Sequence, residues 1–238
     1  MAANDGTLKQ PGEKLIHKAR FIEGAIALIM IIEYLVTEAV AALAWKNPVY
    51  SYSNNYISDL GVSGPPVTFM GRLIYSPLYW VMNAGFFVEG VLAVLAAFLL
   101  MPLFTKKTWR TIIPLIAILH GVGITLVAIF HGSADATKEY TGVMHVTGAA
   151  LAIIFGNVQC ICAGIAAGQS GAPKWFTAYS VVLGLAGLIA LFCPFIEHGV
   201  APGTMERVAV DSFITWDITT GIFLLVGARK FRRIMFQH

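Results

Sequence analysis

The sequence predicts an all-α integral membrane protein, built as a bundle of six transmembrane helices. Two observations carry this prediction. Hydrophobic residues make up 57% of the 238 residues and charged residues only 12%, which is half of the about 25% found in soluble domains. The chain also contains six apolar runs that each reach the about 20 residues needed to cross a bilayer. This composition excludes a soluble globular domain, a disordered chain and a nucleic-acid-binding module.

The first three runs are predicted at Phe21–Trp45, Leu73–Met101 and Thr111–Phe130. The first resembles a signal peptide, because Ala42-Leu43-Ala44 has the pattern of a cleavage site. Its 25 residues exceed the usual apolar length of about 7–15 in signal peptides, and it contains Glu33. We therefore expect an uncleaved first helix. The second and third runs flank a short loop that contains basic residues.

The last three runs are predicted at Thr141–Gly168, Phe176–Pro194 and Val208–Gly227. The fourth contains Gly164-xxx-Gly168, a spacing that lets helices approach closely and that we assign to packing within the bundle. The sixth run is the most polar. We find no linker, repeat or low-complexity segment, so residues 21–228 are predicted to form one transmembrane domain. Residues 1–20 form an N-terminal tail, and residues 229–238 form a basic C-terminal tail.

The distribution of basic residues predicts the orientation. Twelve of the 16 Lys and Arg residues lie in the two tails and in the second and fourth loops. Because cytoplasmic segments are enriched in these residues, both termini are expected to be cytoplasmic in a multi-pass protein of the plasma or inner membrane. The basic tails also suit contacts with anionic membrane lipids and require no nucleic acid. The first, third and fifth loops would then face outward.

Several polar residues lie at the middle of predicted spans. A central charged residue costs about 2.5–3.5 kcal/mol on insertion scales, so these groups are expected to face inward and to pair with one another or to handle protons. The alternative is a hydrogen-bonded network that only holds the bundle together. His120 and His131 are eleven residues apart and would share one face of the third helix. The mid-span residues are Glu33, Glu89, His120, Asn157 and Asp217.

The outward loops contain a set of possible zinc ligands, namely His131, Asp135, His145 and His198. Imidazole and carboxylate groups are the usual ligands of catalytic zinc, which keeps one position for water. Such a water, acidified by the metal, can attack an ester or an amide. The alternative is that these histidines cap helix ends or form hydrogen bonds within loops.

Ser58-Asp59-Leu60-Gly61 is the main motif of the first loop. A Ser-Asp pair before a glycine is typical of a turn or a helix cap. In a functional interpretation Asp59 is an acid, a metal ligand or a partner of Arg207, and Ser58 forms a dyad with His145. The sequence has no nucleophile-elbow motif to support that dyad.

Arg207 and Glu206 precede the last run. With Asn55 they are predicted to bind the anionic headgroup of a lipid, because arginine binds phosphate and carboxylate groups through two hydrogen bonds. The alternative for Arg207 is an interfacial anchor or an internal ion pair. Trp216 lies too deep for an interfacial belt and is expected to line a cavity.

The order of these motifs resembles an uncharacterised membrane family, domain of unknown function 998. The resemblance rests on Asn55-Tyr56-Ile57-Ser58-Asp59-Leu60-Gly61, the Gly-rich third run, His145 and Gly203-xx-Glu206-Arg207. It implies a small polytopic membrane protein but no reaction. The family's recurrent positions would fall on Ser58, Asp59, Gly61, His145, Glu206 and Arg207, whereas His131 lies in a less typical stretch.

Three functions remain open from the sequence. The first is an enzyme that acts on a lipid or lipid-linked substrate from the outer face by hydrolysis or acyl transfer, with zinc as its possible cofactor. Its residue types, but not their spacing, are similar to those of alkaline ceramidases and adiponectin receptors. The second is an accessory or structural subunit of a larger membrane complex, whose partners are other membrane proteins. The third is a small proton-coupled carrier that uses the mid-span carboxylates.

Overall fold

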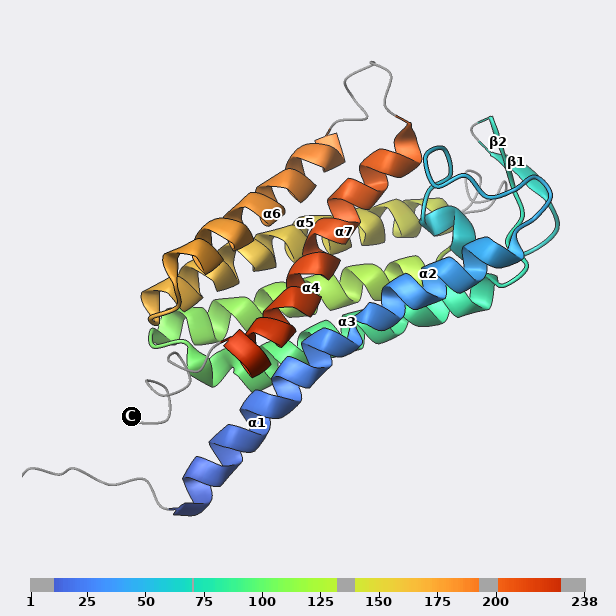
Figure 1. Ribbon diagram of the computed structural model, residues 1–238. Coiled ribbons are helices and arrows are strands. Elements are labelled where there is room, and N and C mark those ends of the chain that lie inside the picture. The colour runs from blue at the N-terminus through green and yellow to red at the C-terminus, as the bar shows by residue number, and fades with distance from the viewer. Residues whose placement is uncertain (1–10, 70, 132–139, 193–200, 228–238) are drawn as a thin grey trace, which may run out of the picture.

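The computed structural model describes residues 11–69, 71–131, 140–192 and 201–227. Long helices run side by side and form one bundle (Figure 1). Six helices are long and apolar enough to cross a membrane, which confirms the predicted six-helix membrane architecture. The helices are α1 (Pro11–Met30), α2 (Ile32–Ala44), α3 (Tyr79–Leu100), α4 (Lys107–Ile129), α5 (Tyr140–Gln169), α6 (Lys174–Phe192) and α7 (Pro202–Ile222).

The first span consists of two helices in line. α1 and α2 are separated at Ile31, and together they give a continuous apolar stretch from Ile16 to Ala44. α3 continues into a 3-10 turn, η2 (Met101–Leu103), and α7 continues into a π-turn, η5 (Phe223–Gly227). The predicted number of spans is therefore correct.

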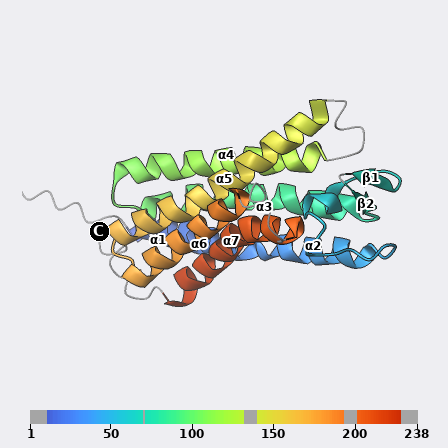
Figure 2. The ribbon, with the colours of Figure 1, turned by 90° about the horizontal axis from the view of Figure 1, so that it is seen from above.

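The two ends of the bundle differ in their connections. At the end where α1 begins and η5 ends, here called the terminus end, the connections between helices are short. At the opposite end, here called the loop end, residues 45–69 and 71–78 form a cap that contains η1 (Ser58–Gly61), β1 (Val67–Phe69) and β2 (Arg72–Ile74). The two strands are antiparallel, with Val67 opposite Ile74. Figures 1 and 2 both show this hairpin beyond the ends of α2 and α3.

Several predicted boundaries were wrong: the first helix begins at Pro11 rather than Phe21 and the third span at Lys107 rather than Thr111. Two other shifts affect the loop end. The second span begins at Tyr79 rather than Leu73, because Leu73 and Ile74 belong to β2 and Pro77 separates that strand from the helix. The sixth span begins at Pro202 rather than Val208. Proline suits the first turn of a helix because it lacks the N–H that has no partner there. The earlier start places Glu206 and Arg207 within α7.

Consecutive helices pack against one another from α3 to α7, and α7 packs back on α1. Small residues permit the close approaches. A Cβ atom added to Gly123 of α4 would lie 2.4 Å from the backbone nitrogen of Ala152 in α5. A Cβ atom added to Gly164 of α5 would lie 2.2 Å from Cβ of Ser180 in α6. The Gly164-xxx-Gly168 face thus packs within the bundle, as predicted.

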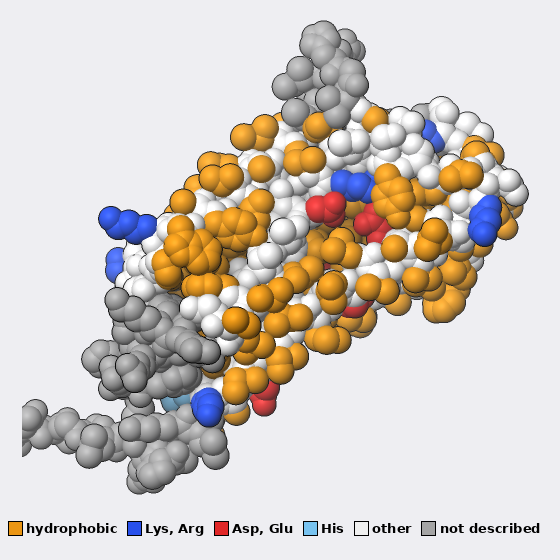
Figure 3. Space-filling view, in the orientation of Figure 1, with side chains coloured by type: hydrophobic (Ala, Val, Ile, Leu, Met, Phe, Trp, Pro, Cys, Tyr) orange, Lys and Arg blue, Asp and Glu red, His pale blue; other side chains and the backbone are white. Residues whose placement is uncertain are grey.

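Apolar side chains cover the outside of the bundle. On the face shown in Figure 3, hydrophobic side chains predominate along the helices, and charged ones lie mainly toward the two ends of the bundle. Val143 of α5 is 68% exposed and Ile189 of α6 is 66% exposed. Such a surface is suited to lipid tails rather than water, so the chain is a multi-pass membrane protein.

Candidate functional site

Arg207 is the centre of a hydrogen-bonded cluster at the loop end. Its Nε and one terminal nitrogen donate to Oε1 of Glu38 in α2, at 3.0 and 2.7 Å. That terminal nitrogen also donates to the hydroxyl of Tyr50 at 2.5 Å. The other terminal nitrogen donates to the carbonyl oxygens of Tyr52, Gly203 and Asn55 at 2.6, 3.0 and 3.1 Å.

A guanidinium group has five N–H donors, and protein acceptors engage every nitrogen of Arg207. The geometry therefore favours the internal ion pair over a lipid phosphate for this side chain. Neighbouring Glu206 accepts from the backbone N–H of Ile57 and also ties the loop to α7. Burial raises the pKa of Tyr50, which keeps its hydroxyl protonated and able to donate to the carbonyl of Tyr56 at 2.9 Å.

Asp59 organises the rest of the cap. It is 4% exposed, and its Oδ2 accepts from the side-chain amide of Asn55, the backbone N–H of Tyr56 and Nε of Arg72, at 3.3, 3.0 and 3.2 Å. The Arg72 guanidinium also lies 4.4 Å from the centre of the Tyr56 ring. Asp59 thus pairs with Arg72, and the suggested pairing with Arg207 is wrong.

The remaining residues of this motif are held by Ser76, just before α3, and by Asn83 of α3. The carbonyl of Gly61 accepts from the side-chain amide of Asn83 at 2.9 Å, and the carbonyl of Leu60 accepts from Ser76 at 2.6 Å. Among the described residues, the Ser58 hydroxyl has no hydrogen-bond partner, and no contact links it to His145. These contacts favour the turn interpretation of Ser58-Asp59-Leu60-Gly61.

His145 lies in the first turns of α5 and faces the end of α4. Its Nδ1 is 2.8 Å from the carbonyl oxygen of Phe130. Because that oxygen only accepts, Nδ1 carries the proton and Nε2 presents a lone pair. Metal-binding histidines and catalytic bases are commonly fixed in this way. His145 also lies within electrostatic range of His131 and Asp59.

His131 lies just beyond α4, which ends at Ile129, so it is not on the helical face of His120. Its ring approaches the hydroxyl of Ser63, with Nε2 at 3.2 Å and Nδ1 at 3.4 Å. The ring of Tyr79 meets the imidazole at an angle of 62°. Burial lowers the pKa of His131, which favours the neutral imidazole.

The structure describes two of the four predicted zinc ligands. His131 and His145 are placed, whereas Asp135 and His198 lie outside the described residues. Within residues 11–69, 71–131, 140–192 and 201–227, no three His, Cys, Asp or Glu side chains are grouped closely enough to hold a metal ion. A zinc site made of the predicted ligands therefore requires Asp135 or His198, and it stays a prediction.

A family profile described as Protein of unknown function (DUF998) matches residues 28–228. The chain belongs to this family. No curated protein and no solved structure matches the chain. The DUF998 assignment agrees with the predicted resemblance, and it brings no activity with it because the family is uncharacterised.

The mid-span residues of this DUF998 protein form a second polar region. Nε2 of His120 lies 2.9 Å from Oε1 of Glu89, and its Nδ1 lies 2.8 Å from the carbonyl oxygen of Ala152. Asp217 lies within electrostatic range of this pair, and Glu33 lies within electrostatic range of Glu89.

Asn157 is near the same depth and donates to the carbonyl oxygens of Ile153 and Ala209. Trp216 lines a cavity, as predicted, and its Nε1 donates to Ser180 at 2.8 Å. Of the mid-span residues that the sequence singled out, Glu89 and His120 are in hydrogen-bond contact, Asp217 and Glu33 lie within electrostatic range of that pair, and Asn157 binds backbone carbonyls.

Sequence reasoning missed Ser63. It follows the Ser-Asp-Leu-Gly motif in Val62-Ser63-Gly64-Pro65-Pro66, where the glycine and prolines indicate a turn. That turn signal could have identified a serine in a loop, where the structure leaves it half-buried. Its contact with His131, which is 68 residues away in the chain, depends on tertiary folding and has no sequence signature.

Proposed function

We propose that this DUF998 protein is a membrane hydrolase or acyltransferase that acts on the ester of a lipid at its loop end. Ser63 is the nucleophile and His131 is its general base. The observation that carries the proposal is the position of the Ser63 hydroxyl beside the His131 ring, 3.2 Å from Nε2 and 3.4 Å from Nδ1, from which a turn of the ring would aim one nitrogen at the hydroxyl. A serine is a weak nucleophile unless a base within hydrogen-bond reach accepts its proton.

The proposed reaction has two balanced steps. Oγ of Ser63 attacks the ester carbonyl while its proton passes to His131, and the C–O bond to the alcohol breaks as His131 returns that proton to the leaving oxygen. The acyl group is then on Ser63. Water or a second alcohol attacks the acyl-serine with His131 as base, which gives a free acid or a transferred ester and restores the hydroxyl. General-base assistance of this kind contributes about 10²–10⁴-fold.

The backbone beside Ser63 supports this role. Gly64 has φ of +104°, and no atom lies within 4 Å of the position a Cβ would take there. No described residue accepts a hydrogen bond from the Gly64 N–H. A free N–H directly after a nucleophile is suited to stabilise the oxyanion that forms when a carbonyl is attacked.

The surroundings of His131 support a lipid substrate. Trp80, next to Tyr79, is 61% exposed, and Tyr140, whose ring meets that of Phe130, is 72% exposed. Tryptophan and tyrosine side chains of this kind occupy the boundary between lipid tails and water. An ester bond of a lipid lies at the same boundary. With the predicted orientation, the substrate would come from the outer leaflet.

A fluorophosphonate probe, which reacts covalently with activated serines, tests the proposal without knowledge of the substrate. Purified wild-type protein in mild detergent is expected to be labelled at Ser63. Ser63→Ala should abolish labelling, and His131→Ala should slow it by about 10²-fold or more. The matched control is Ser58→Ala, which removes a nearby hydroxyl that contacts no histidine and should leave labelling unchanged.

Two results would count against the dyad. Labelling that persists in Ser63→Ala would show that another residue reacts with the probe. An unlabelled wild-type protein would overturn the serine mechanism. In that case, zinc measured by mass spectrometry and lost in the His131→Ala/His145→Ala variant would support the metal-dependent alternative, whereas a metal-free protein would favour an accessory subunit.

A further inference from the structure

A groove of about 510 Å³ lies along the first half of α7, on the outer surface of the bundle. Tyr52 and Ser53 of the cap line it where α7 begins, and Leu183 of α6 lines its other side. Most of the remaining lining comes from α7 itself, between Thr204 and Thr215. We call it the α6–α7 groove. Its volume falls within the range of roughly 300–1,000 Å³ that is typical of ligand pockets.

The groove extends from the loop end into the membrane span. Thr204, Asp211 and Thr215 are spaced by seven and four residues, so they lie on one face of α7. Asp211 is four residues beyond Arg207, which places it about 6 Å further along the helix axis. A carboxyl within a span is costly unless a polar group or a cation faces it.

Side chains that face lipid flank the groove. Val208, which lines it, is 40% exposed, and Val182 and Leu185, close to Leu183 in α6, are 64% and 47% exposed. Figure 3 shows acidic and basic side chains next to each other toward the loop end, with hydrophobic side chains around them. Membrane lipids therefore have access to the groove from the side.

Asp211 is the charged group of the groove that lacks a partner. It is partly exposed, and its Oδ1 has no hydrogen-bond partner. Within the part of the chain that the structure describes, its carboxyl takes part in no ion pair or hydrogen bond. Arg207 lies within its electrostatic range, but that guanidinium is already bound to Glu38.

The charge around Arg207 is negative overall when the neighbouring carboxyls are ionised. Glu38, Glu206 and Asp211 each interact electrostatically with Arg207. Glu38 matches its charge through two hydrogen bonds, and Glu206 accepts from the backbone N–H of Ile57. Asp211 has neither kind of contact. A cation that enters the groove would therefore complete the charge balance, whereas an anion would be repelled by Asp211.

The acceptors in the groove distinguish between two kinds of cationic headgroup. A primary ammonium group has three N–H donors, whereas a trimethylammonium group has none and is bound by cages of aromatic rings. The groove offers the Asp211 carboxyl and the Thr215 hydroxyl as acceptors. Of its lining residues, Tyr52 alone is aromatic, and its ring already packs on Arg207, whose Cζ is 4.7 Å from the ring centre. These features suit a primary ammonium group.

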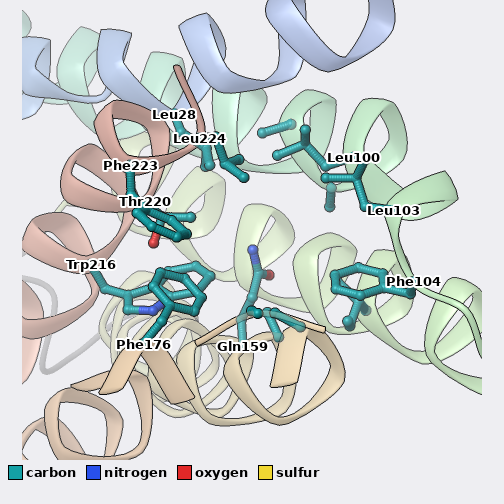
Figure 4. Close-up of a pocket in the computed structure, with 16 residues that line it drawn as sticks. Leu28, Leu100, Leu103, Phe104, Gln159, Phe176, Trp216, Thr220, Phe223 and Leu224 are labelled. Atoms are coloured by element: carbon teal, nitrogen blue, oxygen red, sulfur yellow. The ribbon is translucent and has the colours of Figure 1, made fainter. Parts of the chain in front are cut away.

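A second cavity, inside the bundle, differs from the groove in size and in lining (Figure 4). It has about 60 Å³, and none of its lining residues is charged. Leu100, Phe176 and Leu224 are among the side chains that surround it. Its wall offers nothing that would select a charged ligand, so the headgroup chemistry belongs to the α6–α7 groove.

We propose that the α6–α7 groove binds a phospholipid whose headgroup carries a primary ammonium group, such as phosphatidylethanolamine. The ammonium group pairs with Asp211 and donates to the Thr215 hydroxyl. The hydroxyls of Ser53 and Thr204 donate to the phosphate, and the acyl chains lie against the exposed apolar side chains of α6 and α7. This inference does not rest on the Ser63–His131 dyad, because no residue of that dyad lines the groove.

Native mass spectrometry of the full chain, released from detergent micelles, tests this. Phosphatidylethanolamine, phosphatidylcholine and phosphatidylglycerol with identical acyl chains are titrated separately, and the bound fractions give three affinities. We expect phosphatidylethanolamine to bind about tenfold or more tightly than the other two, because only its ammonium group can form a charge-assisted hydrogen bond to Asp211. Asp211→Asn should abolish this preference, and Thr215→Val should reduce it about two- to threefold.

The matched control is Asp217→Asn. It is the same substitution at another buried acid of α7 that does not line the groove, so its lipid preference should equal that of the wild type. Asp211→Glu keeps a carboxyl and should keep a preference for phosphatidylethanolamine, which separates loss of charge from misfolding. Ser63→Ala should bind as the wild type does, whatever its labelling shows, so the two proposals can fail separately.

Three results would overturn the proposal. The first is equal affinity of the wild type for the three lipids; a dimer lost in Asp211→Asn would then assign the groove to contacts between copies of the chain. The second is an unchanged preference in Asp211→Asn. The third is full competition by soluble phosphoethanolamine at the concentration of the lipid, which would show that the groove binds a free amine rather than a lipid.

Discussion

The loop-end cluster and the mid-span layer both contain buried charged groups, but they satisfy them differently. At the loop end, every nitrogen of Arg207 has an acceptor, and Asp59 accepts from three residues. In the mid-span layer, Glu89 and His120 are paired, whereas Asp217 and Asn157 each keep an unpartnered buried oxygen. The difference indicates that the first region is mainly architectural and that the second has capacity left for an additional hydrogen-bonding partner.

The largest effect is expected from breaking the Arg207–Glu38 pair. Arg207→Ala leaves the Glu38 carboxylate buried and alone and also frees two loop carbonyls and that of Gly203, so we expect a loss of about 3–5 kcal/mol in the free energy of unfolding. The measurement is equilibrium unfolding in mixed micelles. Arg20→Ala is the control, because Arg20 makes an exposed contact with the Phe98 carbonyl and should cost about 1 kcal/mol or less. Equal losses in both variants would contradict the architectural role.

A smaller loss is expected from filling the space beside His120. A Cβ atom added to Gly156 would lie 2.9 Å from the ring of Phe213 and 3.1 Å from Nδ1 of His120. Both rings are buried and would have to shift, so Gly156→Ala should destabilise the protein by about 1–3 kcal/mol. Unfolding in the same micelles measures it. Gly64→Ala has no contact to disturb but requires positive φ, so it reports backbone strain alone.

The comparison between the regions is sharpest for two isosteric changes. Glu38→Gln removes the charge that faces Arg207 and should cost about 2–3 kcal/mol. Asp217→Asn removes a carboxyl that has no cationic partner of its own and should change the free energy of unfolding by about 1 kcal/mol or less. Both are measured by the same unfolding titration. If Asp217→Asn were as damaging as Glu38→Gln, the mid-span layer would be as architectural as the loop end.

The sequence predicted the parts of this structure that depend on local composition. Six spans follow from hydropathy, and the meeting of Glu89 with His120 follows from the cost of isolated charges in lipid. The hairpin at Val67–Ile74 escaped prediction because Leu73 and Ile74 continue an apolar run, and only Pro77 marks the interruption. Local patterns cannot distinguish a short apolar strand from the start of an apolar helix.

The contacts of the candidate site were less predictable for a different reason. Arg207 and Glu38 are 169 residues apart, and Ser63 and His131 are 68 apart. Which partner each side chain finds depends on how the cap folds over the helix ends. The sequence identified Arg207, Asp59 and His131 as notable, but it suggested Arg207 rather than Arg72 as a partner of Asp59, and it did not single out Ser63.

The last prediction concerns the pH dependence of Ser63 labelling. Its expected effect is the smallest, because the free energy of unfolding should be nearly unchanged. Only neutral imidazole accepts a proton, so the labelling rate should fall as pH decreases through the pKa of His131. Burial lowers that pKa below its ordinary value of 6.5. The midpoint of the labelling rate should therefore lie below pH 6.5, and the rate should be constant above it. The measurement is the rate of probe attachment across a pH series.

The direction in which the labelling midpoint moves when His145 is replaced shows how the neighbouring histidine affects the pKa of His131. His145 lies within electrostatic range of His131, and protonation of His145 would lower the pKa of His131 further. His145→Gln keeps an N–H donor for the Phe130 carbonyl and removes that charge, so the midpoint should move upward or stay, never downward. A midpoint above 6.5 in the wild type would mean that an acidic group outside the described residues stabilises the imidazolium. His131 would then act as the base beside a negatively charged group, whereas burial alone would make its pKa lower than 6.5.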